Sequence, residues 1–486
     1  MVLGLKGQVN DWDWEASVQK GRSKSLQTGN RNQGWVRVDY LQQEIDAGNY
    51  NPFGGTTNPD EVIDRITTSL VRRGDSHLTA FDAHITGEAF TFNDDPVMMA
   101  AGIEYRDEDV KDIPDDQFQR GLIFGTESVA AQASRDQWAA YVEFSIPLTE
   151  QLELQLAGRY DDYSDFGDTT NPKVAIRWNP HEDVTVRASW AEGFRAPSLA
   201  QIGLGPSEES SFFVDTFRCE ADGVDCEALD YNTEFAGNKD LEPEESESWN
   251  VGVIWAPSQQ FSVGVDVWSI EQDNKIDEAN FGEIYNAECG NQNSTICVRH
   301  APTGDDTFGV IDVVKSSFVN VTSQEAQGID FSASYNLPLD NFGDVRFNLE
   351  WAYLDKFEKD DMDYTGEYNY PEHRWIASTN WSKDEFSANI NISYTGEFED
   401  TPDFDFDGNL DFEDHKSRMV DSQILVDVQG SYDVTDGLSL TLGINNLFDE
   451  EPPFAIGDAD NDLYGYAQGI HNPRGRYMYS KVTFRF

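Results

Sequence analysis

The last ten residues, Tyr477 to Phe486, alternate in a way that strongly limits the folds open to this chain. Successive side chains of a β-strand point to opposite faces, so apolar and polar residues separate here. The apolar face holds Val482, Phe484 and Phe486. The polar face holds Lys481, Thr483 and Arg485. Such a strand suits the wall of an outer-membrane barrel, with lipid outside and polar groups inside. An amphipathic strand of a soluble sheet would have the same pattern, so the rest of the chain must decide.

Similar alternation recurs along the chain and predicts about seventeen strands of the length that spans a membrane. The clearest are Leu152–Tyr160, Val184–Trp190, Phe261–Trp268, Phe386–Tyr394 and Leu438–Asn445. Short polar turns alternate with long connections, which lie near 21–75, 108–134, 198–245, 274–318, 359–371, 400–421 and 456–475. Short turns on one rim and long loops on the other are typical of a transmembrane barrel. The sequence contains no run of about 18 apolar residues, so it does not predict a membrane-spanning helix.

The charge balance excludes one class of partner. The 486 residues include 90 acidic and 34 basic ones, a net charge of −56, which would repel the phosphates of a nucleic acid. The acidic loops could attract cationic ligands, or they could reflect a saline medium and divalent ions near lipopolysaccharide. No His-Glu-x-x-His, phosphate-loop or Gly-x-Ser-x-Gly motif occurs, so we do not expect an enzyme.

One acidic loop, residues 403–414, fits the twelve-residue calcium-binding template. Gly408 stands at position 6, where the template requires a sharp turn. The oxygen ligands would come from Asp403, Asp405, Asp407, Asn409, Asp411 and Asp414. The last of these replaces the usual glutamate, and no helices are expected on either side. We therefore predict a structural Ca²⁺ site that stiffens an external loop, with a solvated acidic loop as the alternative.

The four cysteines fall in two close pairs, Cys219 with Cys226 and Cys289 with Cys297. Exported proteins meet an oxidising compartment, so we expect disulfides, although four cysteines allow three connectivities. The short spacing favours a bond within each pair. A zinc site is the alternative, but His300 is the only histidine nearby in sequence, and the thiol spacing is too wide for the usual knuckle.

Several motifs of the chain together resemble the C-terminal half of TonB-dependent receptors. The segment 190–198 is similar to a signature strand end of that family, and 237–250 to the loop-to-strand transition that follows. The segments 445–449 and 472–477 look like its last hairpin. The residues that carry the resemblance at the strand end, the hairpin and the terminus are Phe194, Arg195, Ala196, Pro197, Asn446, Leu447, Phe448, Arg474, Gly475, Arg476 and Phe486.

The resemblance implies an all-β fold, an antiparallel transmembrane β-barrel formed by residues 1–486. The family's barrel has about 22 strands around a plug, and this chain supplies about 17 of the 22. Nothing in the sequence resembles a plug domain, an energy-coupling box or an export signal. We therefore expect an incomplete barrel, the C-terminal part of a longer receptor. Its unclosed sheet would leave two strand edges with unpaired backbone groups.

The function implied by the resemblance is active uptake of a scarce ligand across the outer membrane of a Gram-negative bacterium. The ligand could be a siderophore, cobalamin, haem or an oligosaccharide, contacted by the loops 198–245 and 274–318. The expected partners are membrane lipid, lipopolysaccharide and the TonB energy-coupling system, which acts through the plug. The alternative is a passive porin-like channel or an outer-membrane adhesin with the same wall. A secreted all-β enzyme or lectin is a third possibility.

Overall fold

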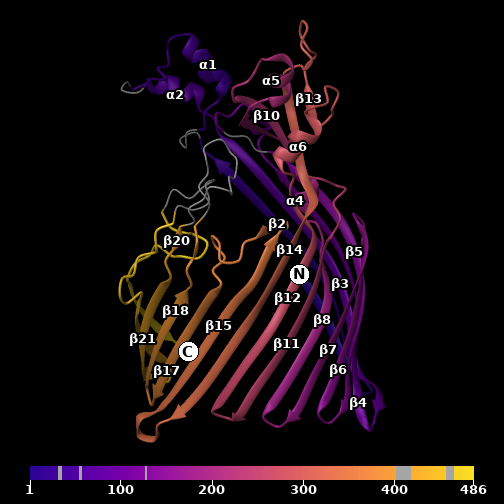
Figure 1. The fold of residues 1–486 in the computed structure, drawn as a ribbon, viewed down its shortest axis with the longest axis vertical. Helices are drawn as coiled ribbons and strands as arrows, with labels where there is room; N and C mark the ends of the chain where they lie inside the picture. Colours follow the sequence, from indigo (N-terminus) through magenta and orange to yellow (C-terminus); the bar gives the residue numbers. More distant parts are fainter. Residues whose placement is uncertain are drawn as a thin grey trace.

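A single curved sheet dominates the computed structural model (Figure 1). The structure describes residues 1–30, 35–53, 57–125, 129–360, 362–400, 418–455 and 465–485. Within them the sheet has 21 strands, of which β9, β10, β13 and β16 are short strands outside the main wall. The other seventeen form the wall, in agreement with the predicted number: β1 (Val2–Val9), β2 (Trp12–Gly29), β3 (Leu70–Phe92), β4 (Asp95–Ile113), β5 (Ala131–Thr149), β6 (Leu152–Tyr163), β7 (Gly167–His181), β8 (Val184–Arg195), β11 (Glu244–Ser258), β12 (Phe261–Glu278), β14 (Ile311–Pro338), β15 (Asp344–Lys359), β17 (His373–Lys383), β18 (Phe386–Thr395), β21 (Gln423–Thr435), β22 (Leu438–Asn445) and β23 (Tyr477–Phe484).

Consecutive wall strands pair antiparallel along the whole wall from β1 to β23. Such a meander needs only tight turns between neighbours. Among the described residues no ladder joins β1 to β23, so each of these two strands has a neighbour on one side only.

The two rims of the wall differ as predicted. At one rim the strands meet in short turns; Asn93 and Asp94, between β3 and β4, both have positive φ, which suits a two-residue hairpin. The other rim, called the mouth below, carries the long connections. Three of those connections are shorter than predicted. β2 runs on to Gly29 and β3 already begins at Leu70; β4 continues to Ile113; and β12 runs to Glu278 while β14 already begins at Ile311. These strand ends rise above the rest of the wall, where polar residues on both faces hide the alternation.

The outer face of the wall is apolar. In the last hairpin Val482 lies opposite Leu440, and Phe484 lies opposite Leu438. Leu442 is 68% exposed and Val482 65% exposed, so no second layer formed by the described residues covers this face. Large apolar side chains that are exposed at alternate positions of a strand are typical of a face in contact with lipid.

The inner face, called the luminal face below, carries polar and charged side chains that pair across strands. Arg187 on β8 donates two hydrogen bonds, of 2.9 and 2.7 Å, to Asp266 on β12. Arg159 on β6 binds Glu104 on β4 at 2.9 Å. Tyr141 and Trp268 also point to this side. Tyr141 packs against Arg159, and Trp268 covers Gly328 on the neighbouring strand.

Smaller elements lie in the connections. The short strands are β9 (Ser207–Phe213), β10 (Leu229–Ala236), β13 (Cys297–Arg299), β16 (Met362–Asp363), β19 (Phe398–Glu399) and β20 (Met419–Val420). The helices are α1 (Val38–Asp46), α2 (Asp60–Ile66), α3 (Asp116–Gln119), α4 (Leu199–Gly203), α5 (Thr216–Asp222), α6 (Phe281–Glu288) and the 3₁₀ turn η2 (Asp340–Phe342). No helix in the described part of the chain is both long and apolar enough to cross a membrane.

Candidate functional site

A folded cap stands above the mouth, built from residues 199–236 and 280–317 (Figure 1). In it β10 pairs antiparallel with β9 and parallel with the first part of β14, while β13 pairs antiparallel with β14. The parallel pairing is possible because the chain returns to the wall through β11 and β12 before β14 rises beside β10. The two connections expected to contact a ligand therefore fold together as one unit.

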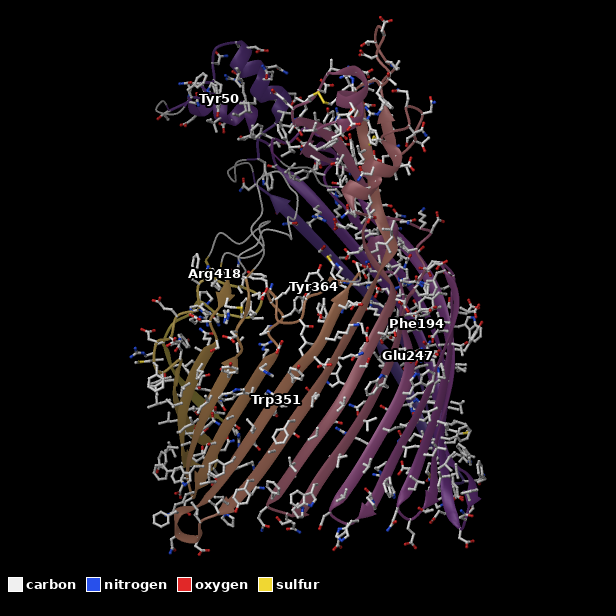
Figure 2. The ribbon with its side chains drawn as sticks, in the orientation of Figure 1. Tyr50, Phe194, Glu247, Trp351, Tyr364 and Arg418 are labelled. Carbon is white, nitrogen blue, oxygen red and sulfur yellow. A yellow bond between two sulfur atoms is a disulfide. The ribbon has the colours of Figure 1, made fainter. Side chains whose placement is uncertain are left out.

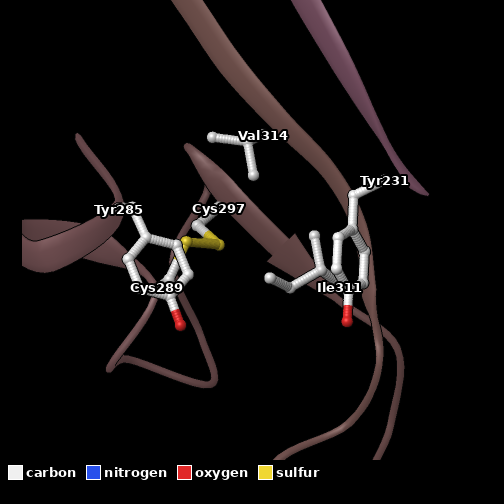
Figure 3. Close-up of a cluster of buried hydrophobic side chains, with 6 residues drawn as sticks. All are labelled: Tyr231, Tyr285, Cys289, Cys297, Ile311 and Val314. Atoms are coloured by element: carbon white, nitrogen blue, oxygen red, sulfur yellow. A yellow bond between two sulfur atoms is a disulfide. The ribbon is translucent and has the colours of Figure 1, made fainter. Parts of the chain in front are cut away.

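Two disulfides brace the cap: Cys219 is bonded to Cys226, and Cys289 to Cys297. These are the pairs that the short spacing favours. The second disulfide is fully buried within the apolar core of the cap (Figure 3). The buried members of that core are Tyr231, Tyr285, Cys289, Cys297, Ile311 and Val314. The cap thus has its own small hydrophobic core, separate from the wall.

A buried ion pair joins the two halves of the cap. Arg299 on β13 donates to both carboxylate oxygens of Asp215, at 2.6 and 2.9 Å, and both side chains are fully buried. Asp215 also accepts from the hydroxyl of Tyr285 at 3.1 Å. Arg299 further donates to the backbone carbonyls of Cys289 and Gly309. A charge taken out of water needs this degree of compensation.

A second set of polar contacts ties α5 to the loop before β14. Arg218 is paired with Asp225 and, at 3.1 Å, with Asp306. Asp222 accepts from the backbone amides of Thr307 and Phe308, at 2.6 and 3.0 Å. These two backbone bonds hold the pKa of Asp222 below its usual value. Both buried arginines of the cap, Arg218 and Arg299, are therefore paired with carboxylates of the cap itself.

The motif residue Arg195 ends β8 and binds Glu244, the first residue of β11. Glu244 is only 2% exposed and also accepts from the amide of Ile276 and the side chain of Gln272, both at 2.8 Å. One carboxylate thus fastens three adjacent wall strands at the base of the cap. The sequence motif contained Glu244, but its neighbours on β12 lie about thirty residues away and could not be recognised from spacing.

The rest of the strand-end motif fixes the chain as it leaves the wall. Phe194 packs edge-on against Tyr163, with ring centres 5.8 Å apart, and lies near the top of the wall (Figure 2). Pro197 is buried, and its carbonyl accepts from Arg135 at 2.7 Å. Ala196, between them, is half-buried. Ser198 then caps α4 in a reciprocal capping box with Gln201. The motif therefore has a structural role at the root of the cap.

The C-terminal motif closes the last hairpin at the mouth. Asn446 has a φ of 50°, and its side chain bridges both backbone groups of Glu450 at 2.8 Å. The amide of Arg476 donates to Asp449 at 2.6 Å, and a Cβ on Gly475 would come within 2.7 Å of the same carboxylate. The flanking motif residues are half-buried Leu447, exposed Phe448, and Arg474, which lies over the ring of Tyr477.

Two predicted features lie outside the described residues. They are the calcium loop, with Asp403, Asp405, Asp407, Asn409, Asp411 and Asp414, and the terminal Phe486. Within the described residues no group of three or more His, Cys, Asp or Glu side chains is placed to hold a metal ion.

A cavity of about 610 Å³ opens on the luminal face at the mouth, between the wall and the chain around residue 470. Wall strands β12, β14, β15, β17, β18 and β21 contribute polar side chains, and Ile470 and Asn472 cover them. Beside it His471 is 5% exposed and contacts Gln423 through Nδ1 at 3.1 Å. Burial, and secondly the charge of Arg374, lowers the pKa of His471. This cavity was not predicted, because its residues come from six strands.

Comparison with known proteins decides the family. Residues 3–447 match the family model of the TonB-dependent receptor-like β-barrel. The chain belongs to the TonB-dependent receptor family. It is 22% identical to the iron-regulated outer membrane virulence protein of Vibrio cholerae over 76% of its length, and 22% identical to the vitamin B12 transporter BtuB of Vibrio vulnificus over 80%. The chain spans 47% of the length of each of these relatives.

The same fold appears in a solved structure. The siderophore receptor PirA of Acinetobacter baumannii matches 100% of this chain and 62% of its own, with a TM-score of 0.67 and 16% identity. The prediction of a TonB-dependent receptor barrel in the outer membrane of a Gram-negative bacterium is confirmed. These relatives are receptors and transporters, which agrees at the level of the family with a chain that is not an enzyme.

Proposed function

We propose that this chain forms most of the barrel wall of a receptor that takes up a scarce iron chelate or a cobalamin-type ligand. The observation that carries the proposal is the family match over a wall with an apolar outer face, a polar luminal face and a braced cap at the mouth. The names of the relatives support iron-linked and vitamin B12 ligands over haem or oligosaccharides. A passive channel or an adhesin is not favoured by these relatives.

We further propose that the chain is the C-terminal part of a longer receptor. Two observations support this: the chain spans about half of its relatives, and no ladder joins β1 to β23 among the described residues. Energy from TonB would then act through a plug in the remaining part. Mass spectrometry of the protein purified from its own outer membrane tests this proposal, because it measures the length of the mature chain directly.

The uptake proposal is tested in the cell. Deletion of the coding segment for this chain should slow growth under iron limitation or in medium where vitamin B12 is required. A protonophore should abolish uptake of the ligand in the parent strain, because TonB-linked transport consumes inner-membrane energy. Uptake that continues at the same rate after the protonophore would instead support a passive channel.

The outer face is proposed to contact membrane lipid and lipopolysaccharide, and the loop 403–414 to bind Ca²⁺. The support for calcium is the donor set alone, since carboxylate and carbonyl oxygens in this spacing are the ligands that this ion prefers. A bound ion would stiffen this loop.

A further inference from the structure

The two disulfides of the cap differ in their exposure to solvent. Cys289 and Cys297 are both 0% exposed and lie inside the apolar core of the cap (Figure 3). Cys226 is exposed, and its partner Cys219 is half-buried. Thiol–disulfide exchange begins when a thiolate attacks one sulfur atom, so its rate depends on access to that atom. The cysteine most open to attack is therefore Cys226.

The chain around Cys226 is strongly acidic. The segment 216–230 carries five carboxylates and one cation, Arg218, which is already paired with carboxylates of the cap. Glu220 and Glu227 are exposed, and neither forms an ion pair within the described residues. Such a field repels a thiolate that carries further negative charge, whereas an ammonium group on the same molecule offsets the repulsion. These charges therefore favour a cationic aminothiol as the attacking molecule.

The bond between Cys219 and Cys226 closes a loop at the end of α5. Inside this loop Asp225 has a φ of 55°, in the left-handed region, and pairs with Arg218. Asp222, also inside the loop, accepts two backbone hydrogen bonds from the connection before β14. Opening the disulfide removes the constraint that holds both carboxylates in place. The buried core of the cap includes neither cysteine of this pair, so the core keeps its own disulfide and packing.

We propose that Cys219–Cys226 is a site of thiol–disulfide exchange that prefers cationic aminothiols, and that its opening detaches the end of α5 from the loop 305–308. The thiolate of the aminothiol attacks Sγ of Cys226 and forms a mixed disulfide there, while Cys219 leaves as a thiolate and takes up a proton. A second aminothiol thiolate attacks the sulfur of the first. This step releases the aminothiol disulfide and the thiolate of Cys226, which is then protonated. The protein disulfide gains two electrons, and two aminothiol molecules lose one each. The site does not depend on the ligand that the receptor takes up.

The selectivity is tested with three thiols on the full chain in detergent at low salt. The thiolate of 2-aminoethanethiol has no net charge, that of 2-mercaptoethanol has one negative charge, and that of 3-mercaptopropanesulfonate has two. Each rate is measured at equal thiolate concentration and divided by the rate with a small uncharged disulfide. Alkylation of the released thiols and mass spectrometry of the peptides identify which cysteines have been reduced.

We expect the peptides of Cys219 and Cys226 to be alkylated, and those of Cys289 and Cys297 to remain disulfide-bonded. The relative rate should fall about three- to tenfold for each added negative charge on the thiol. In about 1 M salt the three relative rates should converge, because the Debye length there is only about 3 Å.

Two variants separate the effect of the local charges from general effects. Glu220→Gln, Glu227→Gln removes both exposed carboxylates and should reduce the spread of the three rates at least about threefold. Glu283→Gln is the matched control, because it removes an exposed carboxylate of the cap that lies on α6, outside the closed loop. It should leave the spread of the rates unchanged.

Hydrogen exchange measures the consequence of opening. After reduction, amides in 220–228 and 305–308 should exchange about tenfold faster, while those of β13 keep their protection. The variant Cys219→Ser, Cys226→Ser should show the same exchange without any thiol. The inference is overturned if both disulfides open at the same rate, if the anionic thiol reacts as fast as the cationic one at low salt, or if 305–308 stays protected after reduction.

Discussion

The buried pair between Arg299 and Asp215 gives the sharpest prediction about the cap. The variant Asp215→Ala removes the carboxylate that accepts both guanidinium bonds and the bond from Tyr285. It leaves the Arg299 charge without a partner in a fully buried position. Breaking a buried pair in this way costs about 3–5 kcal/mol. The loss should open the cap and leave the wall intact, because the wall strands hold one another by separate ladders.

Hydrogen exchange measures this loss directly. A cost of about 3 kcal/mol corresponds to roughly a hundredfold faster opening, so amides in 211–236 and 281–317 should exchange about a hundredfold faster than in the parent chain. Amides in the wall strand β22 should keep their protection. The disulfides keep each loop of the cap closed, so the change is expected in exchange rates and not in the overall dimensions of the folded protein.

Two controls distinguish the loss of the ion pair from non-specific destabilisation of the cap. Asp312→Asn alters an exposed pair with His300 and should change stability by less than about 0.5 kcal/mol. The double variant Asp215→Leu, Arg299→Met removes both charges and should recover most of the lost protection. The reasoning is refuted if the single variant exchanges like the parent, or if the double variant is as open as the single one.

Three further predictions follow from the described contacts and the sequence. Glu247, labelled on the wall in Figure 2, lies opposite Glu192 and Glu271 on its two neighbouring strands. Glu247→Gln should therefore stabilise the wall by about 0.2–1 kcal/mol in thermal melts, and a lower melting temperature would count against this. Burial lowers the pKa of His471 in the folded chain, so as pH falls the unfolded chain binds this proton first, and the loop around His471 should loosen between pH 7 and 5. His471→Gln should remove that pH dependence of exchange, and equal profiles would refute the assignment. A peptide of residues 403–414 should bind Ca²⁺ saturably in calorimetry, and no binding at millimolar Ca²⁺ would exclude the site.

Much of the wall could be predicted from the sequence because one physical cause repeats in every strand. Lipid on one side and water on the other require alternation, and the predicted strand Leu438–Asn445 has the same bounds in the structure. The ends of β2 and β3 were missed because they rise into water on both faces, where alternation is no longer required. Short spacing also indicated both cysteine pairs.

The contacts of the mouth could not be predicted, because they join residues that are far apart in the chain. Asp215 and Arg299 are separated by 84 positions, and neither belongs to a recognisable pattern. Arg195 and Glu244 both lie in motifs that the sequence revealed, but only the fold shows that the two side chains form an ion pair. The luminal cavity depends on strand register, which the alternation fixes only to within two residues.

The most direct test of the account is a nitroxide scan along β22 in a lipid bilayer. The chain has no free cysteine, so a single cysteine introduced in turn at Ser439, Leu440, Thr441 and Leu442 is a unique labelling site. The account predicts that labels at Leu440 and Leu442 are accessible to dissolved oxygen, and that labels at Ser439 and Thr441 are accessible to a water-soluble nickel complex. Equal accessibility at all four positions would contradict a wall with lipid on one face and water on the other.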